Sequence, residues 1–432
     1  MKRSTAAVLG AATALALALT GCSSGDDSGG DGTDTLTLAG WSLATTPEFK
    51  ALADGFHAAH PDITVELKEY DPKNYDTQMI ADLAAGKAPD IYVQKTLKNF
   101  YTYQNGKQLL DVSDVAAGLG PDTNGLASYQ VEGKTYAIPY RQDSWVIYYN
   151  KALFDQARVK YPDGSWTWDD YAAAGRRLTA GLETAGSQAL GVYQHVWQST
   201  LQGFALAQTP GADLSSGDFG YLKPYYTRAV DLQKAGAQVS LGDATTNNLT
   251  YQAQFGKQRA AMMTMGTWYI ATLLSQQKSG DADRFEWGIA PAPQRDKSTT
   301  GTSATPVTFA DPTGMGINPK INKDKIETAK KFLAYAGSAD AAKALAGIGI
   351  TPANTDAAAD TIFAVPGVPT DAVSKFAFTK HETRPENPVG KYTAPLQNIL
   401  NDLHTAVMSG STDIDTAIAE AQDRARNEVL NK

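Results

Sequence analysis

Aromatic and hydrogen-bonding side chains occur together beside four predicted strands of this chain. They are Trp41, Gln94, Arg141, Asp143 and Trp268. An indole ring offers a flat apolar face on which a ligand can stack, while Gln, Arg and Asp each offer several hydrogen-bonding atoms. A sugar needs both kinds of contact, because it has apolar C–H faces and polar hydroxyl groups. The set therefore indicates a binding site for a sugar-like ligand.

The elements that position the first of these side chains alternate between strand and helix. Apolar alternation and a short apolar run predict strands at residues 35–39, 63–67 and 91–93. A helix opens at Pro47 and is broken at Pro61, and a second helix ends at Gly86. This order predicts an α/β layer with mostly parallel strands, in which ligands bind outside the carboxyl ends of the strands.

Later segments carry the signals of further helices and strands. Thr167 and Asp170 have the spacing of a capping box, which predicts a helix through Leu178. A hairpin is expected around Glu132-Gly133. We further expect a strand at 145–149, mainly helical structure at 180–260, a strand at 261–265, a polar crossover at 291–303, and helices at 324–336 and from Thr412.

Composition narrows the classes of function. The 432 residues are 42% hydrophobic and 19% charged, which suits a well-packed globular protein long enough for two domains. A formal net charge of −8 argues against binding nucleic acid or anionic lipid through a basic face. The single cysteine excludes an internal disulfide, and the five histidines show no metal-binding spacing. We expect no metal and no cofactor.

The N-terminal segment has the pattern of a secretory signal. Lys2 and Arg3 precede an uncharged run at 6–19, which is too short to span a membrane. The sequence Leu-Thr-Gly-Cys that ends at Cys22 resembles a bacterial lipobox, which implies lipid attachment to that cysteine. An ordinary signal peptide with a chance cysteine is the alternative. Residues 1–21 are thus predicted as the signal, and the Gly, Ser and Asp-rich residues 22–34 as a disordered tether.

A set of short motifs runs in one order along the chain. The set comprises Gly40-Trp41, Phe56-x-x-x-His60-Pro61-Asp62-Ile63, Ala84-Ala85-Gly86-Lys87-Ala88-Pro89-Asp90-Ile91, Tyr149-Asn150-Lys151-x-x-Phe154, Trp166-Thr167-Trp168-Asp169, Phe255-Gly256-Lys257-x-x-Ala260-Ala261-Met262 and Gly266-Thr267-Trp268. Together they resemble the extracellular solute-binding proteins of bacterial ABC importers, in the sugar-binding group that includes maltose-binding protein. The resemblance implies an α/β fold of two lobes, type II among periplasmic binding proteins, each a mixed, mostly parallel sheet flanked by helices. Lobe 1 is predicted at 35–142 and 290–336, and lobe 2 at 143–289 and 337–432.

The resemblance also implies roles for single residues. Trp268 matches a tryptophan that stacks on the sugar, and Asp143 matches an acidic sugar contact. Gln94 stands at a contact position of the second loop, but the aromatic, acidic and basic trio of maltose-binding protein is absent there, so maltodextrin is not implied. Trp197 lies where the second lobe contacts sugar. Further candidates are Trp41, Arg141, His195, Asp311, Arg384 and Tyr392.

Alternatives remain for these residues. Trp268 could belong to the core, Asp143 could form an interlobe salt bridge, and Asp311 could sit in an Asp-Pro turn. Asp143 and Asp311 could also be read as the paired carboxylates of a glycoside hydrolase, although no recognisable catalytic motif surrounds them.

The predicted function is a monomeric, lipid-anchored receptor on the outer face of the cell membrane. It would capture a carbohydrate of the oligosaccharide class by lobe closure and deliver it to the permease subunits of an ABC transporter. We expect no catalytic residues and no nucleic-acid partner. A receptor for a polyol, peptide or polyamine, or a ligand sensor for a membrane kinase, is the alternative.

Overall fold

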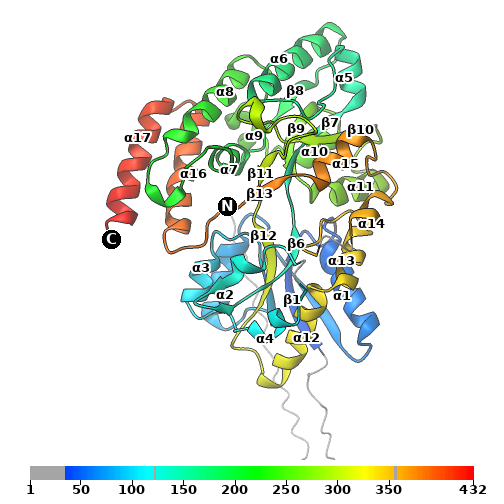
Figure 1. The fold of residues 1–432 in the computed structure, drawn as a ribbon, viewed down its shortest axis with the longest axis vertical. Coiled ribbons are helices and arrows are strands. Elements are labelled where there is room, and N and C mark those ends of the chain that lie inside the picture. Colours follow the sequence, from blue (N-terminus) through cyan, green and yellow to red (C-terminus); the bar gives the residue numbers. More distant parts are fainter. Residues whose placement is uncertain (1–34, 121–122, 355–357) are drawn as a thin grey trace, which may run out of the picture. The chain divides into compact units, whose positions relative to one another are not determined.

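The first part of the chain folds as the strand–helix alternation predicts. The computed structural model describes residues 35–120, 123–354 and 358–432. Its first elements are β1 (Thr35–Trp41), α1 (Glu48–Ala59), β2 (Thr64–Tyr70), α2 (Tyr75–Ala85) and β3 (Ile91–Gln94), shown in Figure 1. Pro47 directly precedes α1, and Gly86 ends α2 with a φ of 70°, which glycine adopts without steric cost. These five predictions are confirmed.

A five-stranded sheet, called the first sheet below, has the order β2–β1–β3–β12–β6. β6 spans Ile138–Gln142 and β12 spans Pro312–Ile317. β1 runs parallel to β2 and β3, whereas β12 runs antiparallel to β3 and β6. Buried side chains of these strands form one core with those of α1, α12 (Ile326–Ala336) and α13 (Ala339–Ala346).

A four-stranded sheet, called the second sheet below, has the order β10–β7–β9–β8. Its strands are β7 (Trp145–Asn150), β8 (Leu190–Tyr193), β9 (Ala260–Gly266) and β10 (Trp287–Pro291). β7 is antiparallel to both β9 and β10, and only β8 and β9 run parallel. The expectation of a mostly parallel sheet in each lobe is therefore wrong for the second sheet.

The physical reason lies in how the chain enters each sheet. The first residue of β7, Trp145, pairs with the last residue of β9, Gly266. In the same way Pro312 at the start of β12 pairs with Gln142 at the end of β6. A strand that arrives from the other sheet enters at the edge where its neighbours end, so it must run antiparallel to them.

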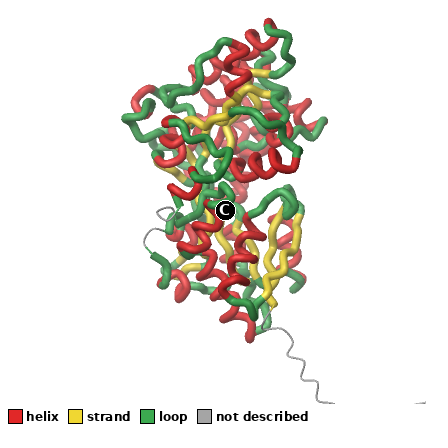
Figure 2. Tube along the Cα trace, turned by 90° about the vertical axis from the view of Figure 1, so that its right-hand side faces the viewer, coloured by secondary structure: helices red, strands yellow, loops and turns green. Residues whose placement is uncertain are grey.

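Helices account for much of the remaining described chain, and Figure 2 shows helices in red and strands in yellow. The helices not yet given are α3 (Phe100–Asn105), α4 (Ser113–Ala117), α5 (Lys151–Ala157), α6 (Trp168–Thr184), α7 (Ser199–Gln208), α8 (Lys223–Lys234), α9 (Leu241–Thr246), α10 (Tyr251–Gly256), α11 (Tyr269–Ser279), α14 (Ala359–Phe363), α15 (Ala372–Thr379), α16 (Thr393–Ser409) and α17 (Ile414–Arg424). The predicted capping box is confirmed, because Thr167 and Asp170 exchange hydrogen bonds at the start of α6.

Short strands complete the fold. The predicted hairpin is confirmed as β4 (Gln130–Val131) and β5 (Lys134–Thr135), and β11 (Val307–Phe309) pairs in parallel with β13 (Glu382–Arg384). The region 180–260 is mainly helical as expected, but it also contains β8, which the sequence analysis missed.

The residues that make up the two cores correct two of the predicted lobe borders. The sequence analysis placed residues from 337 onward in the second lobe, yet Ala341 and Leu345 of α13 belong to the core of the first sheet. Ser338 caps α13 and starts another helix on the same core, and the passage to the second sheet follows only after Ile350. Pro291, predicted for lobe 1, ends β10 in the second sheet.

The predicted signal at 1–21, the tether at 22–34 and Cys22 lie outside the described residues. Within the described ranges, no helix is both long enough and apolar enough to cross a membrane.

Candidate functional site

Four aromatic side chains gather at the end of the second sheet where β8 and β9 finish. This aromatic cluster consists of His195, Trp197, Tyr251 and Trp268. The ring centroid of Trp197 lies 4.4 Å from that of His195, 5.7 Å from that of Tyr251 and 6.5 Å from that of Trp268. Trp197 is 39% exposed, whereas His195 and Tyr251 are buried. The cluster thus offers a solvent-accessible indole supported from beneath by other rings.

Local structure explains how each ring is placed. His195 and Trp197 follow β8, and Trp268 follows β9, so the parallel pairing of the two strands brings their ends to one edge. Tyr251 is the first residue of α10, which Thr250 caps by accepting a hydrogen bond from the backbone of Ala253. The indole Nε1 of Trp268 donates to the Tyr251 hydroxyl at 3.3 Å, which fixes the plane of Trp268.

Hydrogen bonds indicate the tautomer of His195. The hydroxyl of Tyr193 donates its one hydrogen to the carbonyl of Leu249 at 3.0 Å, and it also lies 3.0 Å from Nδ1 of His195. Nδ1 must then be the donor, which leaves Nε2 as an acceptor. Burial, aided by the positive charge of Lys73, lowers the pKa of His195 to about 4, so the imidazole is neutral near pH 7. The cluster carries no charge and suits a neutral ligand.

At the end of the first sheet, the predicted contact Trp41 is largely used by the protein itself. Its ring makes edge contacts with Phe49 and Tyr75 at 5.0 and 5.2 Å and is buried. The ammonium of Lys95 lies 5.1 Å from the Trp41 ring centroid and donates to the carbonyl of Pro72 at 2.6 Å. Burial lowers the pKa of Lys95. Trp41 therefore holds a lysine at this edge.

Gln94, the last residue of β3, is only 1% exposed. Neither atom of its side-chain amide has a hydrogen bond of ordinary geometry within the protein. In the loop that follows β3, the ammonium of Lys98 donates a hydrogen bond to Oδ1 of Asn398 in α16 at 2.8 Å. This bond links the loop after β3 to a helix that packs with the second sheet.

Arg141 and Asp143 form a buried ionic group with Glu48, called the charged network below. The guanidinium of Arg141 lies 2.5 Å from the Glu48 carboxylate and 2.8 Å from that of Asp143, and it donates to Thr313 at 3.2 Å. The other oxygen of Asp143 accepts a hydrogen bond from Thr267 at 3.0 Å. Asp143 thus forms the salt bridge that was the alternative to a sugar contact.

Burial and charge oppose each other in this network. Burial raises the pKa of Asp143 to about 6, although the Arg141 guanidinium acts to lower it. Burial also disfavours the charged form of Arg141, but Glu48 and Asp143 hold the pKa of Arg141 above its ordinary value. Arg141 and Asp143 are therefore both charged at neutral pH, and each lowers the cost of burying the other.

Asp311 is fully occupied by the protein. Its two oxygens accept four hydrogen bonds: from the backbone of Leu97 at 3.0 Å, from that of Glu386 and Asn387 at 3.0 Å each, and from the Asn387 amide at 2.6 Å. It therefore ties the loop after β3 to the chain after β13. Arg384 likewise bonds to Glu382 and to the carbonyl of Ala207.

The family model for a bacterial extracellular solute-binding protein matches residues 51–370, well over half of this chain. The chain belongs to that family.

Relatives of this solute-binding protein match parts of it. A binding protein of Brucella abortus (strain 2308) is 26% identical over 273 residues, or 62% of this chain and 64% of the relative. The chain therefore spans less than two thirds of that relative's length. An arabinooligosaccharide-binding protein of Bacillus subtilis (strain 168) is 26% identical over 188 residues, or 41% of this chain and 42% of the relative.

Solved structures match almost the whole solute-binding chain. A sugar transporter from Rhizobium etli has 28% identity and a TM-score of 0.74, covering 91% of this chain and 99% of that one. An ABC substrate-binding protein from Listeria monocytogenes in complex with cycloalternan has 21% identity and the same TM-score of 0.74, covering 91% and 98%. These likenesses establish the two-lobe, type II fold.

Sequence reasoning missed two residues of this solute-binding protein's candidate site. Tyr251 joins the aromatic cluster, and Glu48 is the second carboxylate beside Arg141. Glu48 carried one usable signal, because an acidic residue directly after Pro47 suits the first turn of a helix. Tyr251 carried none, since the sequence does not show that α10 starts beside β8 and β9.

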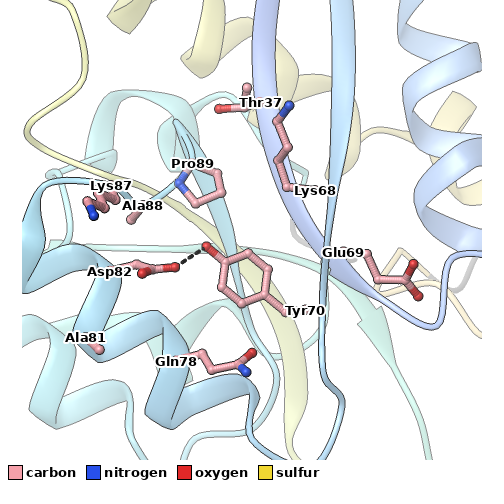
Figure 3. A pocket seen from close by; sticks show the side chains of 10 residues that line it. All are labelled: Thr37, Lys68, Glu69, Tyr70, Gln78, Ala81, Asp82, Lys87, Ala88 and Pro89. Carbon is pink, nitrogen blue, oxygen red and sulfur yellow. Dashed lines mark hydrogen bonds between the residues drawn. The ribbon is translucent and has the colours of Figure 1, made fainter. Parts of the chain in front are cut away.

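A separate surface hollow of about 650 Å³ lies between β2 and α2, beside the turn at 87–89. Figure 3 shows Tyr70 reaching across it to Asp82, to which its hydroxyl donates at 2.7 Å. Lys68, Gln78 and Lys87 also line it. None of the predicted ligand residues lines this hollow. Across the described ranges, no group of three or more His, Cys, Asp or Glu side chains is arranged to hold a metal ion.

Proposed function

We propose that this solute-binding protein is a receptor that captures an oligosaccharide for import by an ABC transporter. The aromatic cluster carries the proposal: a partly exposed Trp197 beside Trp268 offers stacking area for C–H faces. The Nε2 atom of His195 adds a neutral acceptor for a hydroxyl group. The relative that binds arabinooligosaccharides and the neighbour crystallised with cycloalternan support the choice of an oligosaccharide.

Capture proceeds by closure of the two lobes around the ligand. The ligand first binds the aromatic cluster of the second lobe, and Lys95 and the loop after β3 then reach it from the first lobe. Only contacts that are stronger in the closed state than in the open one can drive this closure. Arg141, Asp143 and Asp311 hold the frame and do not touch the sugar, because their polar atoms are already paired within the protein.

Delivery requires the protein to stay near a membrane permease. A lipid on Cys22 and the tether at 22–34 would hold the receptor at the outer face of the cell membrane as a monomer. The tether raises the local concentration near the permease without new contacts. The receptor releases its ligand unchanged and is not an enzyme: neither Asp143 nor Asp311 is free to act as a catalytic acid.

A thermal-shift panel tests this function. The purified protein is melted with mono-, di- and oligosaccharides, polyols and short peptides. At 100 times its dissociation constant, a ligand stabilises the folded state by about 2.7 kcal/mol. We expect a shift from one class of oligosaccharide, with the sugar recovered intact. If only polyols or only peptides shifted the melting temperature, the proposed ligand class would change from sugars to that class. If the sugar were recovered cleaved, the proposal that the protein is a receptor would be refuted.

A further inference from the structure

Three chain segments connect the elements of the first sheet to those of the second. They are residues 141–144, which run from the end of β6 to the start of β7, residues 309–312, which run from the last residue of β11 to the first of β12, and residues 350–354 after α13. They run side by side: the backbone of Gln142 donates to the carbonyl of Thr351 at 3.2 Å, and Ala353 donates to that of Tyr140 at 3.0 Å. Any change in the angle between the lobes must be absorbed by these segments.

A continuous series of buried contacts includes residues of the first and third segments and Thr313, which directly follows the second segment. From the first sheet, Glu48 of α1 pairs with Arg141, which also reaches Thr313 at the start of β12. Arg141 pairs with Asp143, and Asp143 accepts from Thr267 in the loop after β9. The hydroxyl of Thr351 donates to that of Thr267 at 2.9 Å. The series therefore begins on a helix of the first sheet and ends on a loop of the second.

Its members are shielded from solvent. Glu48 and Thr267 are 0% exposed, Asp143 is 3% exposed and Arg141 is 7% exposed. Removing one member would leave a buried charge or donor unpaired, which is much more costly than losing a surface ion pair. The series is thus an energetically significant connection between the two lobes at the point where they must pivot.

We propose that Arg141 and Asp143 are positioning residues, which set the range of angles that the two lobes adopt by joining Glu48 to Thr267. They act through the crossover segments and not through contact with the ligand. The lobe movement itself rests on the proposed function, but the coupling between the sheets does not depend on which ligand is bound.

Asp143 is the member that can change charge near neutral pH. The groups that face it are the guanidinium of Arg141, the carboxylate of Glu48, the hydroxyl of Thr267 and the backbone N–H of Trp268, with the phenols of Tyr140, Tyr148 and Tyr251 nearby. Because burial raises its pKa to about 6, Asp143 is ionised at pH 7.5 and protonated at pH 5. Protonation removes its attraction for Arg141, so the coupling should weaken as the pH falls through 6.

Distance distributions between the lobes test the proposal without a ligand. Spin labels are placed at Asp62→Cys on the first lobe and Lys234→Cys on the second, both exposed, in the full chain with Cys22→Ser so that no other thiol reacts. We expect a narrow distribution at pH 7.5 that broadens at pH 5. In Asp143→Asn the distribution should be broad at both pH values.

Two further variants separate coupling from loss of folding. Thr267→Val removes the link to Asp143 and keeps all charges, so it should broaden the distribution at pH 7.5. Asp415→Asn, in an exposed pair with Lys223, should behave as the wild type. Unchanged distributions in both Asp143→Asn and Thr267→Val, at both pH values, would overturn the proposal. Because no ligand is present, a failed sugar panel would not affect this result.

Discussion

The aromatic cluster and the charged network lie at neighbouring strand ends but use their side chains in opposite ways. The cluster leaves Trp197 39% exposed to solvent and keeps His195 neutral. The network buries its charges and pairs them inside the protein. The sequence analysis named residues of both groups as candidate ligand contacts, among them Trp268 and Asp143. The difference teaches that a polar side chain at a strand end can either contact a ligand or hold the protein's own structure together. Which of the two it does depends on whether it is already paired within the protein.

Arg141→Ala should have the largest effect, and on stability rather than on ligand contact. The substitution leaves the buried carboxylates of Glu48 and Asp143 without their cationic partner. This should lower the free energy of unfolding by about 3–5 kcal/mol. Urea denaturation monitored by circular dichroism measures it. A loss below about 1 kcal/mol would mean that the network is solvated in solution and that the contrast with the cluster fails.

Asp311→Ala should have the second-largest effect, because four hydrogen-bond donors lose their acceptor at once. We expect a loss of about 2–3 kcal/mol in the free energy of unfolding. The same denaturation experiment applies, with Asp415→Ala in an exposed pair as the control. If Asp311→Ala instead weakened ligand binding with unchanged stability, Asp311 would belong to the site.

Trp197→Ala should show the reverse behaviour of the network variants. Its exposed ring contributes little to the core, so the melting temperature without ligand should stay nearly unchanged. Affinity for the sugar found by the panel should fall about tenfold, or about 1.4 kcal/mol, by isothermal titration. Tyr161→Ala is a matched control, since Tyr161 is 36% exposed and lies outside the cluster. Equal losses of affinity in both variants would contradict the assignment.

Lys87→Ala should have the smallest effect. Lys87 lines the hollow between β2 and α2, which contains no residue of the cluster or of the network. Affinity should change by less than about twofold, which is within 0.4 kcal/mol. A larger loss would show that the hollow takes part in ligand binding and would add a third region to the comparison.

Much of the fold could be predicted because local chemistry determines it. Gly86 ends a helix and Thr167 caps one whatever surrounds them, and both predictions are confirmed. The antiparallel pairing of β7 was not predictable in this way, because strand direction follows from where the chain enters the sheet. β8 is four residues long and lies in a mainly helical region, so no periodicity revealed it.

The candidate site was less predictable than the fold. Trp197 and Trp268 could be named from their places after strands and from the resemblance, and the structure brings them together. Whether Asp143 would face a ligand or Arg141 depended on Glu48, which lies far away in the sequence. Partners of that kind come from tertiary packing, which no local pattern encodes.

The exposure of Trp197 gives the molecule a built-in optical reporter. Of its seven tryptophans, Trp197 is the one that is exposed, at 39%, whereas the other six are buried or half-buried. Its emission should therefore be the reddest and the most accessible to a dissolved quencher. A molecule that covers this indole would shift the emission to shorter wavelength and shield it from the quencher. The intrinsic tryptophan fluorescence of the unmodified protein can thus be used to search crude mixtures for its natural solute.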